Sequence, residues 1–591
     1  MLLLLADSFL LFFITMNVGI LTRNLLEKIF RCTIVSDLLG IFLLGLIFSS
    51  VYFNIFSFWL PVNYLSLIPL AILSLVVFFT NRDKMLSMGR SIRYQWQYFR
   101  LPAAGLHVNA HWSRLLIFFS VLVVFFVYWV LPPANADSRT YHYLSILWYE
   151  KYKVVPGLVN VFGCFAFNPV SFIIQAAYSF TGPAGQSLYP LNGVLVGLLL
   201  MWLLVRLFKA KSAGIAFAYL VLIVILYRPM LINISSPSSD VLVIVCVTYP
   251  LVRLLEFILS KNITVPHVLV PMLIILYSLI AKLSSFPVLM ILPFILYWLP
   301  GKKFSGAFFW KVFVIALLLY IPWLGRNYIM SGYLVYPFPY LDLFHPDWKA
   351  PPDVMKLDIF YINVVPKLNG QAAILQTPGA HLSWLFPWLL YFFRNHSPLD
   401  PAIFILAILS PLYWIIPFRG KAKIDKRAWV LWLVTYGAVW IWLITSPVIR
   451  FGASILALAI VFPFFTMAYD DFERKRQGWY RTVLSMLFIA ASVYYVRAAY
   501  IKPTTYPFTL ADCWLFPLKD YTYKNDNAGF PYRVLRGGVK LYVADGTHHC
   551  MNAGLPCMVL DYAKIEMRGD RLDQGFRTTS DRIRSLCPFI K

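Results

Sequence analysis

Side chains able to take part in proton chemistry are concentrated in the stretch 131–168, which follows an apolar run and opens with a Pro-Pro break. They include Asp137, Arg139, Tyr141, His142 and Glu150. The chain has only 26 acidic residues, so a carboxylate beside an apolar segment and close to Tyr and His is a candidate for proton transfer. We therefore expect Asp137 to be the chemical centre of a membrane enzyme, with His142 as a second catalytic candidate.

A second carboxylate, Asp240, stands at the start of a later apolar run, after the serine-rich sequence ISSPSS. Ser and Asp are favoured at helix N-termini, where an acidic side chain also complements the helix dipole. Asp240 is thus either a capping residue or a second carboxylate that faces the Asp137 loop. We count it among the catalytic candidates.

Three cations next to apolar runs are candidates for binding an anion: Lys282, Arg326 with its neighbour Asn327, and Arg450. A guanidinium group suits bidentate phosphate contacts, and an ammonium group near a membrane is costly unless it is paired. Lys282 could also snorkel, and Arg326 could anchor its helix at the interface. In the aromatic, proline-rich loop that follows, Asp347 and Trp348 are candidates for binding the sugar acceptor.

The elements that position these residues are apolar helices. Hydrophobic residues make up 60% of the 591 residues and aromatic residues 18%, and apolar runs of membrane-spanning length recur along the chain. The net charge of +25 is spread over short loops that recur after every second apolar run, which is typical of the positive-inside pattern and argues against nucleic-acid binding. We expect an all-α polytopic membrane protein with about 14 transmembrane helices and both termini outside.

Three regions follow from this topology. Residues 1–114 hold N-terminal transmembrane helices and a basic cytoplasmic loop, and residues 115–500 form a transmembrane core with large outer loops at 132–190 and 326–400. Residues 501–591 are expected to form a small extracytoplasmic domain of α/β type, because short β-prone runs appear there. In that tail a Cys550–Cys557 disulfide is plausible, and unrelated thiols are the alternative.

Several common reactions have no signature in the sequence. Walker A, Gly-x-Gly-x-x-Gly, His-Glu-x-x-His and serine-elbow motifs are absent. His345 and Asp347 do not have a metal-ligand spacing by themselves. No cofactor is indicated, and a divalent metal stays open.

The order of these features resembles the C-type (GT-C-like) glycosyltransferases, polytopic enzymes that transfer a sugar from a polyprenyl-phosphate or diphosphate donor at the outer membrane face. Asp137 in NADSRTYHY is similar to their loop general base. Arg326 in PWLGRN and Arg450 in SPVIRF resemble the later cations that hold the donor phosphate. A second acidic residue often follows the loop Asp in that family, whereas Ser138 and Arg139 follow it here.

The chain also resembles a little-characterised group of bacterial multi-pass proteins. The shared pieces are VPGL, FN, SP-x-x-D, PW-x-x-RN, SGY-x-x-YP and a Cys-containing outer tail, here at residues 155–158, 167–168, 236–240, 322–327, 331–337 and 550–557. This likeness spans roughly residues 115–580.

Together these patterns predict a glycosyltransferase of the cell envelope. It would lie in the bacterial cytoplasmic (inner) membrane with its active site facing outward, and transfer a sugar from a polyprenyl-linked donor to a glycan or lipid acceptor. The expected donor-phosphate ligands are Lys282, Arg326, Asn327 and Arg450. The alternative is a transporter or flippase for a lipid-linked or anionic substrate, in which the same charges line a route.

Overall fold

The computed structural model describes most of the chain. The described residues are 1–82, 108–210, 212–299, 306–368, 384–415, 425–465, 486, 489–497, 513–517, 530–544, 550, 554–558 and 564–578. Parts of the expected basic loops (Lys302, Lys303, Arg419 and residues 474–481) and part of the expected last span, near residues 481–499, lie outside these ranges. Within them the chain is mostly helical.

Seven described helices are long and apolar enough to cross a membrane. They are α1 (Leu2–Phe30), α2 (Leu38–Phe56), α9 (Pro190–Lys209), α10 (Ala213–Asn233), α11 (Asp240–Leu259), α14 (Gly306–Ser331) and α20 (Lys426–Thr445). Helices suit such runs because a helix satisfies its own backbone hydrogen bonds away from water. The chain is therefore well suited to a membrane.

Shorter apolar helices accompany these seven. They are η1 (Tyr64–Ser66) with α3 (Leu67–Thr80), the apolar part Leu115–Val130 of α5 (Val108–Val130), α12 (Val265–Ala281), η5 (Leu283–Ile291) with α13 (Leu292–Trp298), α18 (Leu399–Leu409) and α21 (Ile449–Phe465). Each lies near an expected span, but most are shorter than a bilayer requires of a straight helix. The total of about fourteen spans stays a prediction.

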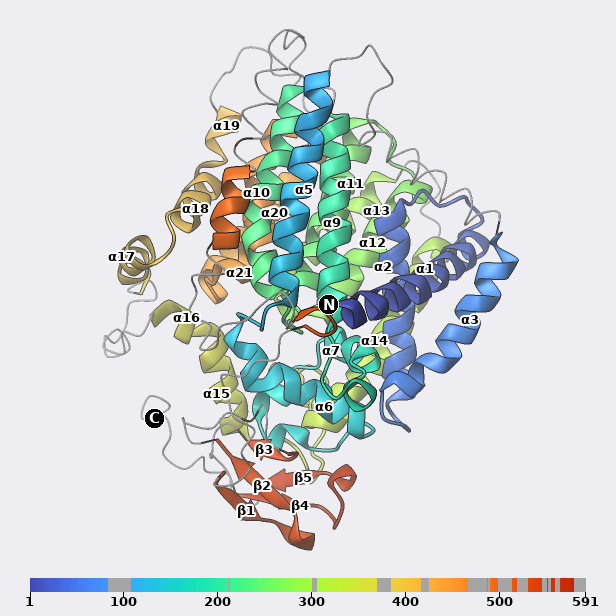
Figure 1. Cartoon of the computed structure of the whole chain (residues 1–591), viewed down its shortest axis with the longest axis vertical. Coiled ribbons are helices and arrows are strands. Elements are labelled where there is room, and N and C mark those ends of the chain that lie inside the picture. The colour runs from blue at the N-terminus through green and yellow to red at the C-terminus, as the bar shows by residue number, and fades with distance from the viewer. Residues whose placement is uncertain are drawn as a thin grey trace.

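In Figure 1, α5, α9, α10 and α11 run alongside one another, and α1 crosses obliquely beside them. At one end of these helices lies a layer built from residues 131–189. Its elements are η2 (Ser138–His142, a π-helical turn), α6 (Tyr143–Lys151), η3 (Leu158–Asn160), η4 (Gly163–Ala166), α7 (Val170–Tyr178) and α8 (Thr181–Ala184). We call it the loop layer. Every residue of α7 is buried, so this expected outer loop is a packed part of the fold.

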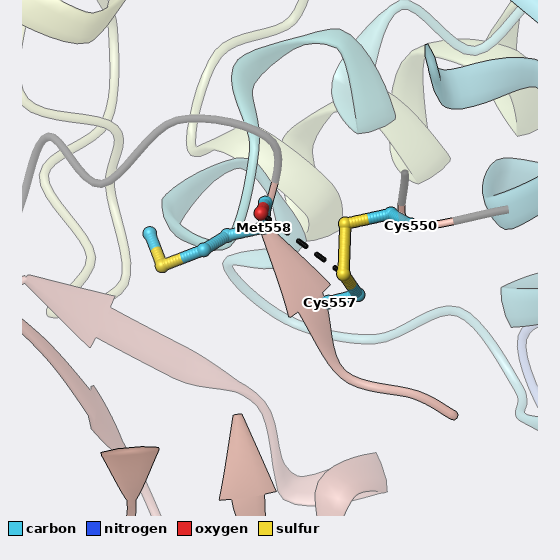
Figure 2. The surroundings of a disulfide bond; sticks show 3 residues. All are labelled: Cys550, Cys557 and Met558. Carbon is cyan, nitrogen blue, oxygen red and sulfur yellow. Dashed lines mark hydrogen bonds between the residues drawn. A yellow bond between two sulfur atoms is a disulfide. The ribbon is translucent and has the colours of Figure 1, made fainter. Parts of the chain in front are cut away.

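The strands lie beyond the loop layer in Figure 1. One sheet has the order β1 (Tyr532–Val534), β2 (Lys540–Val543), β3 (Cys557–Met558), with β1 antiparallel and β3 parallel to β2; β4 (Ile565–Met567) and β5 (Phe576–Thr578) form a separate antiparallel pair. Figure 2 shows the disulfide that joins Cys550 to Cys557 at the start of β3, with 5.7 Å between the two Cα atoms. Two short 3₁₀ turns, η10 (Arg536–Gly538) and η12 (Leu572–Gln574), connect strands.

The remaining helices belong to the region between α14 and α20. They are α15 (Pro352–Asn363), α16 (Val365–Leu368), α17 (Leu385–Asn395) and α19 (Leu412–Ile415). Residues 369–383 of the expected outer loop 326–400 lie outside the described part. That a separate domain spans residues 501–591 also stays a prediction, because only some of its strands and turns are described.

Candidate functional site

Four charged residues from four separate segments meet at the end of the helices that faces the loop layer. Asp137 Oδ2 lies 2.5 Å from Arg450 Nη2, and Asp240 Oδ1 lies 2.5 Å from Lys282 Nζ. The second oxygen of Asp240 lies 3.8 Å from Arg450 Nε, which links the two ion pairs. We call these four residues the charge cluster. The sequence analysis placed all four in one site.

Each member of the charge cluster lies where a helix begins or ends. Asp137 immediately precedes η2, and Asp240 is the first residue of α11, where the helix dipole favours a carboxylate. Lys282 has extended backbone between α12 and η5, and Arg450 lies in the first turn of α21, after Pro447. Helix ends can bring distant parts of a chain together, which explains how sequence positions so far apart converge.

Buried amide and hydroxyl groups hold this arrangement. Asn135 Oδ1 accepts hydrogen bonds from Arg450 Nη1 (2.8 Å) and from the backbone N–H of Asp137 (3.1 Å), while its Nδ2 donates to Asn233 Oδ1 (2.8 Å). Asn192 Nδ2 lies within hydrogen-bond distance of the carbonyls of Asn233, Ser236 and Ser238. The loop before α11 is therefore fixed to α9 and to the loop layer.

The charge cluster has an open side and a buried side. The side chains of Asp137, Arg450 and Lys282 are 36%, 30% and 27% exposed, whereas that of Asp240 is 4% exposed. Lys282 Nζ also lies 3.7 Å from the ring centroid of Phe451, a cation–π contact that partly compensates its burial. A ligand from outside would therefore meet Asp137, Arg450 and Lys282 before Asp240.

His142 lies on the buried side of the site. Its ring packs 5.1 Å from Phe172 and 4.4 Å from Tyr141, and within the described part of the chain Nδ1 has no hydrogen-bond partner. Burial lowers the pKa of His142 to about 4, although the nearby carboxylates of Asp137 and Asp240 oppose this shift. His142 is thus neutral at pH 7 and able to accept a proton.

Arg326 and Asn327 belong to a different set of contacts. Arg326 is buried; its Nε donates to Asn168 Oδ1 (3.1 Å), and its guanidinium lies 4.4 Å from the ring centroid of Tyr149. Asn168 Nδ2 donates to Asn327 Oδ1 (2.9 Å), and Trp323 Nε1 donates to the Asn168 carbonyl (2.8 Å). Among the described residues, no hydrogen bond or ion pair joins this set to the charge cluster.

Asp347 and Trp348, the expected acceptor ligands, contact the strand region. Asp347 Oδ2 accepts a hydrogen bond from Arg568 Nε (2.9 Å), and the same guanidinium lies 4.5 Å from the ring centroid of Trp348. The Trp348 carbonyl accepts from Asn160 Nδ2 (2.9 Å). Both residues thus hold the segment after β4 against the helical part. An acceptor that bound to them would share them with Arg568.

Asp358 is a buried carboxyl group that the sequence analysis did not single out. Asp358 in α15 accepts a hydrogen bond from the phenol of Tyr336 (2.8 Å) and packs so closely on Gly163 that a Cβ there would overlap its Oδ2. Burial raises the pKa of Asp358 to about 7. The sequence holds a signal for this burial, because Asp358 follows Val354 at a spacing of four and so shares the apolar face of its helix.

The divalent metal that the sequence leaves open has no evident ligand set in the described ranges. In them, no group of three or more His, Cys, Asp or Glu side chains is arranged to hold a metal ion. The cations of the charge cluster instead occupy the places next to Asp137 and Asp240. This arrangement suits an anion better than a cation.

Comparison with known families matches residues 1–457 to the model of a domain of unknown function, DUF8201. The chain belongs to this family. The matched DUF8201 region contains all four residues of the charge cluster and ends before β1. No curated protein and no solved structure matches the chain.

Proposed function

We propose that this DUF8201 protein is a membrane glycosyltransferase. It transfers a sugar from a polyprenyl-phosphate-linked donor to an acceptor hydroxyl at the outer face of the bacterial cytoplasmic membrane. The observation that carries the proposal is the convergence of Asp137, Asp240, Lys282 and Arg450 in one partly exposed cluster at the end of apolar helices. Such a cluster combines a carboxylate able to take a proton with two cations able to hold a phosphate.

In the proposed reaction, Asp137 accepts the proton of the acceptor hydroxyl as its oxygen bonds to the anomeric carbon of the sugar. The bond from that carbon to the donor phosphate breaks, and the electron pair leaves with the phosphate. Arg450 and Lys282 stabilise the charge that develops there. Asp240, buried beside Lys282, keeps the ammonium in place.

Arg326 and Asn327 are not needed in this scheme as direct ligands of the donor phosphate. Their contacts with Asn168 place them in the packing of the loop layer on α14. Their sequence-based role as phosphate ligands stays a prediction. The donor is therefore assigned to Arg450 and Lys282, whose side chains are partly exposed.

A transporter or flippase would use the same charges to pass an anion across the membrane. Such a protein makes no covalent bond between a sugar and an acceptor. The two functions therefore differ in whether a glycosylated product appears when donor and acceptor are both supplied.

The test is the variant Asp137→Asn in purified full-length protein supplied with a panel of polyprenyl-linked sugar donors. We expect turnover to fall by on the order of a hundredfold, the usual contribution of a general base, while donor binding persists. Asp342→Asn is the matched control, because it removes another carboxylate of an outer ion pair, with Lys349. Full activity in Asp137→Asn would remove Asp137 from the mechanism, and absence of product from the parent protein across the panel would favour transport.

A further inference from the structure

The charge cluster balances its own charges. Arg450 and Lys282 supply two positive charges, and Asp137 and Asp240 supply two negative ones, each ion pair closing at 2.5 Å. An anion that binds here therefore meets cations whose charge is already compensated. For it to bind strongly, one of the internal carboxylates must give up its cation.

The two carboxylates are not equally able to move away. Asp240 is 4% exposed, begins α11 and contacts both Lys282 and Arg450. Asp137 is 36% exposed, and its carboxylate has one cation partner among the described residues, Arg450. Displacing Asp240 would leave a charge buried without a partner, whereas Asp137 can turn toward solvent. Asp137 is therefore the exchangeable member.

Contacts other than the one with Asp137 hold Arg450 in place. Its Nη1 donates to Asn135 Oδ1 (2.8 Å), and Asn135 is itself fixed by the buried amide of Asn233 (2.8 Å). The buried Nε of Arg450 has no hydrogen-bond partner in the described part of the chain. This nitrogen faces Asp240 Oδ2 at 3.8 Å, so the guanidinium offers an incoming oxyanion the donor that Asp137 now uses.

We propose that Asp137 is a displaceable counter-ion: a phosphate group that enters the charge cluster takes its place on Arg450 and releases the carboxylate. This inference rests on the proposed function, because it makes the arrival of the donor phosphate the event that frees the base. Before the donor binds, Arg450 holds the carboxylate of Asp137. After it binds, the carboxylate is free to accept the proton of the acceptor hydroxyl.

This mechanism has a consequence that can be measured without any sugar transfer. If Asp137 competes with phosphate for Arg450, removing its charge must strengthen phosphate binding. We expect Asp137→Asn to lower the dissociation constant for inorganic phosphate by on the order of fivefold, a size in keeping with a partly exposed ion pair. The effect must act through Arg450 and so disappear in the Arg450→Gln background.

The experiment uses the purified full chain in nanodiscs of phosphatidylcholine at constant ionic strength, since salt screens such contacts. Phosphate binding is measured for the parent, Asp137→Asn, Arg450→Gln and the double variant, which together form a double-mutant cycle. Asp342→Asn is the control for the change in net charge. Thermal unfolding of each variant shows that the protein is folded at the measuring temperature.

Several results would overturn the proposal. These are an unchanged or weaker phosphate affinity in Asp137→Asn, an equal gain in Asp342→Asn, or a gain that persists in the double variant. Competition by a polyprenyl phosphate supports a substrate phosphate as the natural occupant, and equal competition by phosphatidylglycerol would contradict it. Failure of the proposed sugar transfer is a separate outcome. If the parent protein makes no product but Asp137→Asn binds phosphate more tightly than the parent, the proposed function fails and the displaceable counter-ion still holds.

Discussion

At the scale of single residues, several charged side chains among the described apolar helices are paired with a partner of opposite sign. The pairs of the charge cluster have an equivalent at the opposite ends of α9 and α11, where Arg206 and Arg253 contact Asp37 and Glu256. Burying a charge without a partner costs several kcal/mol, so pairing is a condition for placing such groups among apolar helices. The two groups differ in exposure: the side chains of Arg450 and Asp137 are 30% and 36% exposed, whereas those of Arg206 and Asp37 are 19% and 23% exposed.

Asp358 is the residue whose environment gives a clear dependence on pH. Its pKa in the folded protein is about 7, compared with an ordinary value of 3.8. Between these values the folded protein holds a proton that the unfolded chain releases, so the free energy of unfolding falls as the pH rises from about 4 to about 7. We expect Asp358→Asn to remove this fall and to be more stable than the parent at pH 8, by roughly 2–4 kcal/mol, and about equally stable near pH 4.

Thermal unfolding of parent and variant between pH 5 and pH 8 measures this effect. Asp353→Asn, in the first turn of the same helix and paired with Lys356, is the control. Parallel pH profiles for Asp358→Asn and the parent would show that the carboxyl group of Asp358 is already ionised at low pH. In that case a partner other than Tyr336 would have to stabilise its charge.

How far the sequence could predict the site depends on which contacts determine the position of each residue. Asp137, Asp240, Lys282 and Arg450 could be assigned to one site because each borders an apolar run, and membrane topology alone places such borders on one side. Arg326 borders an apolar run too, but its contact with Asn168 depends on the conformation of the loop layer. No periodicity or charge pattern encodes that conformation, so the separation of Arg326 from the charge cluster could not be foreseen.

At the scale of elements, the loop layer is the part that the sequence described least well. Residues 132–190 were expected to form a large outer loop, and the structure divides them into short helices. The complete burial of α7 comes from packing against α2, α6 and α9, which are distant in sequence or separated by turns. Such contacts arise only once the long helices have assembled.

Asn160 joins three segments and so fixes β5 to the loop layer. Its Nδ2 lies within hydrogen-bond distance of the carbonyls of Gly157, Trp348 and Phe576, and its Oδ1 accepts from Thr578 Oγ1 (2.6 Å). Asn160→Ala would leave these buried groups without their partner, at a cost of about 1–3 kcal/mol. We expect β5 to detach more often and trypsin to cleave the 564–578 segment faster.

Limited trypsin digestion followed by mass spectrometry of the released peptides measures this detachment. Asn395→Ala is the control, because Asn395 is exposed and its side chain donates only to the carbonyl of Tyr391 one turn earlier. Equal cleavage rates in Asn160→Ala and Asn395→Ala would mean that other contacts, such as that of Arg568 with Asp347, hold the strands without Asn160.

At the scale of the whole molecule, the strands and the charge cluster must face the same side of a membrane. The backbone N–H of Phe576 donates to the carbonyl of Pro156 (2.9 Å), and the ring of Phe576 lies 5.9 Å from that of Trp148. These contacts tie β5 to the loop layer, which holds Asp137. The described basic residues Arg206, Arg253 and Lys261 lie at the opposite ends of α9, α11 and the turn that follows. From the positive-inside rule, we expect that end to face the cytoplasm.

Cysteine labelling tests this orientation together with the disulfide. In a background that retains only Cys550 and Cys557, we expect a membrane-impermeant maleimide to label Lys151→Cys in intact cells but to leave Ser260→Cys unlabelled until the membrane is opened. Both positions are exposed, and they lie at opposite ends of the helices, on α6 and after α11. Cys550 and Cys557 should react only after reduction, because an oxidising outer compartment preserves their bond. Labelling of Ser260→Cys alone in intact cells would reverse the orientation. Labelling of Cys550 and Cys557 without reductant would place the strands in a reducing compartment. Either result would remove the outward-facing site from the proposed function while leaving the geometry of the charge cluster intact.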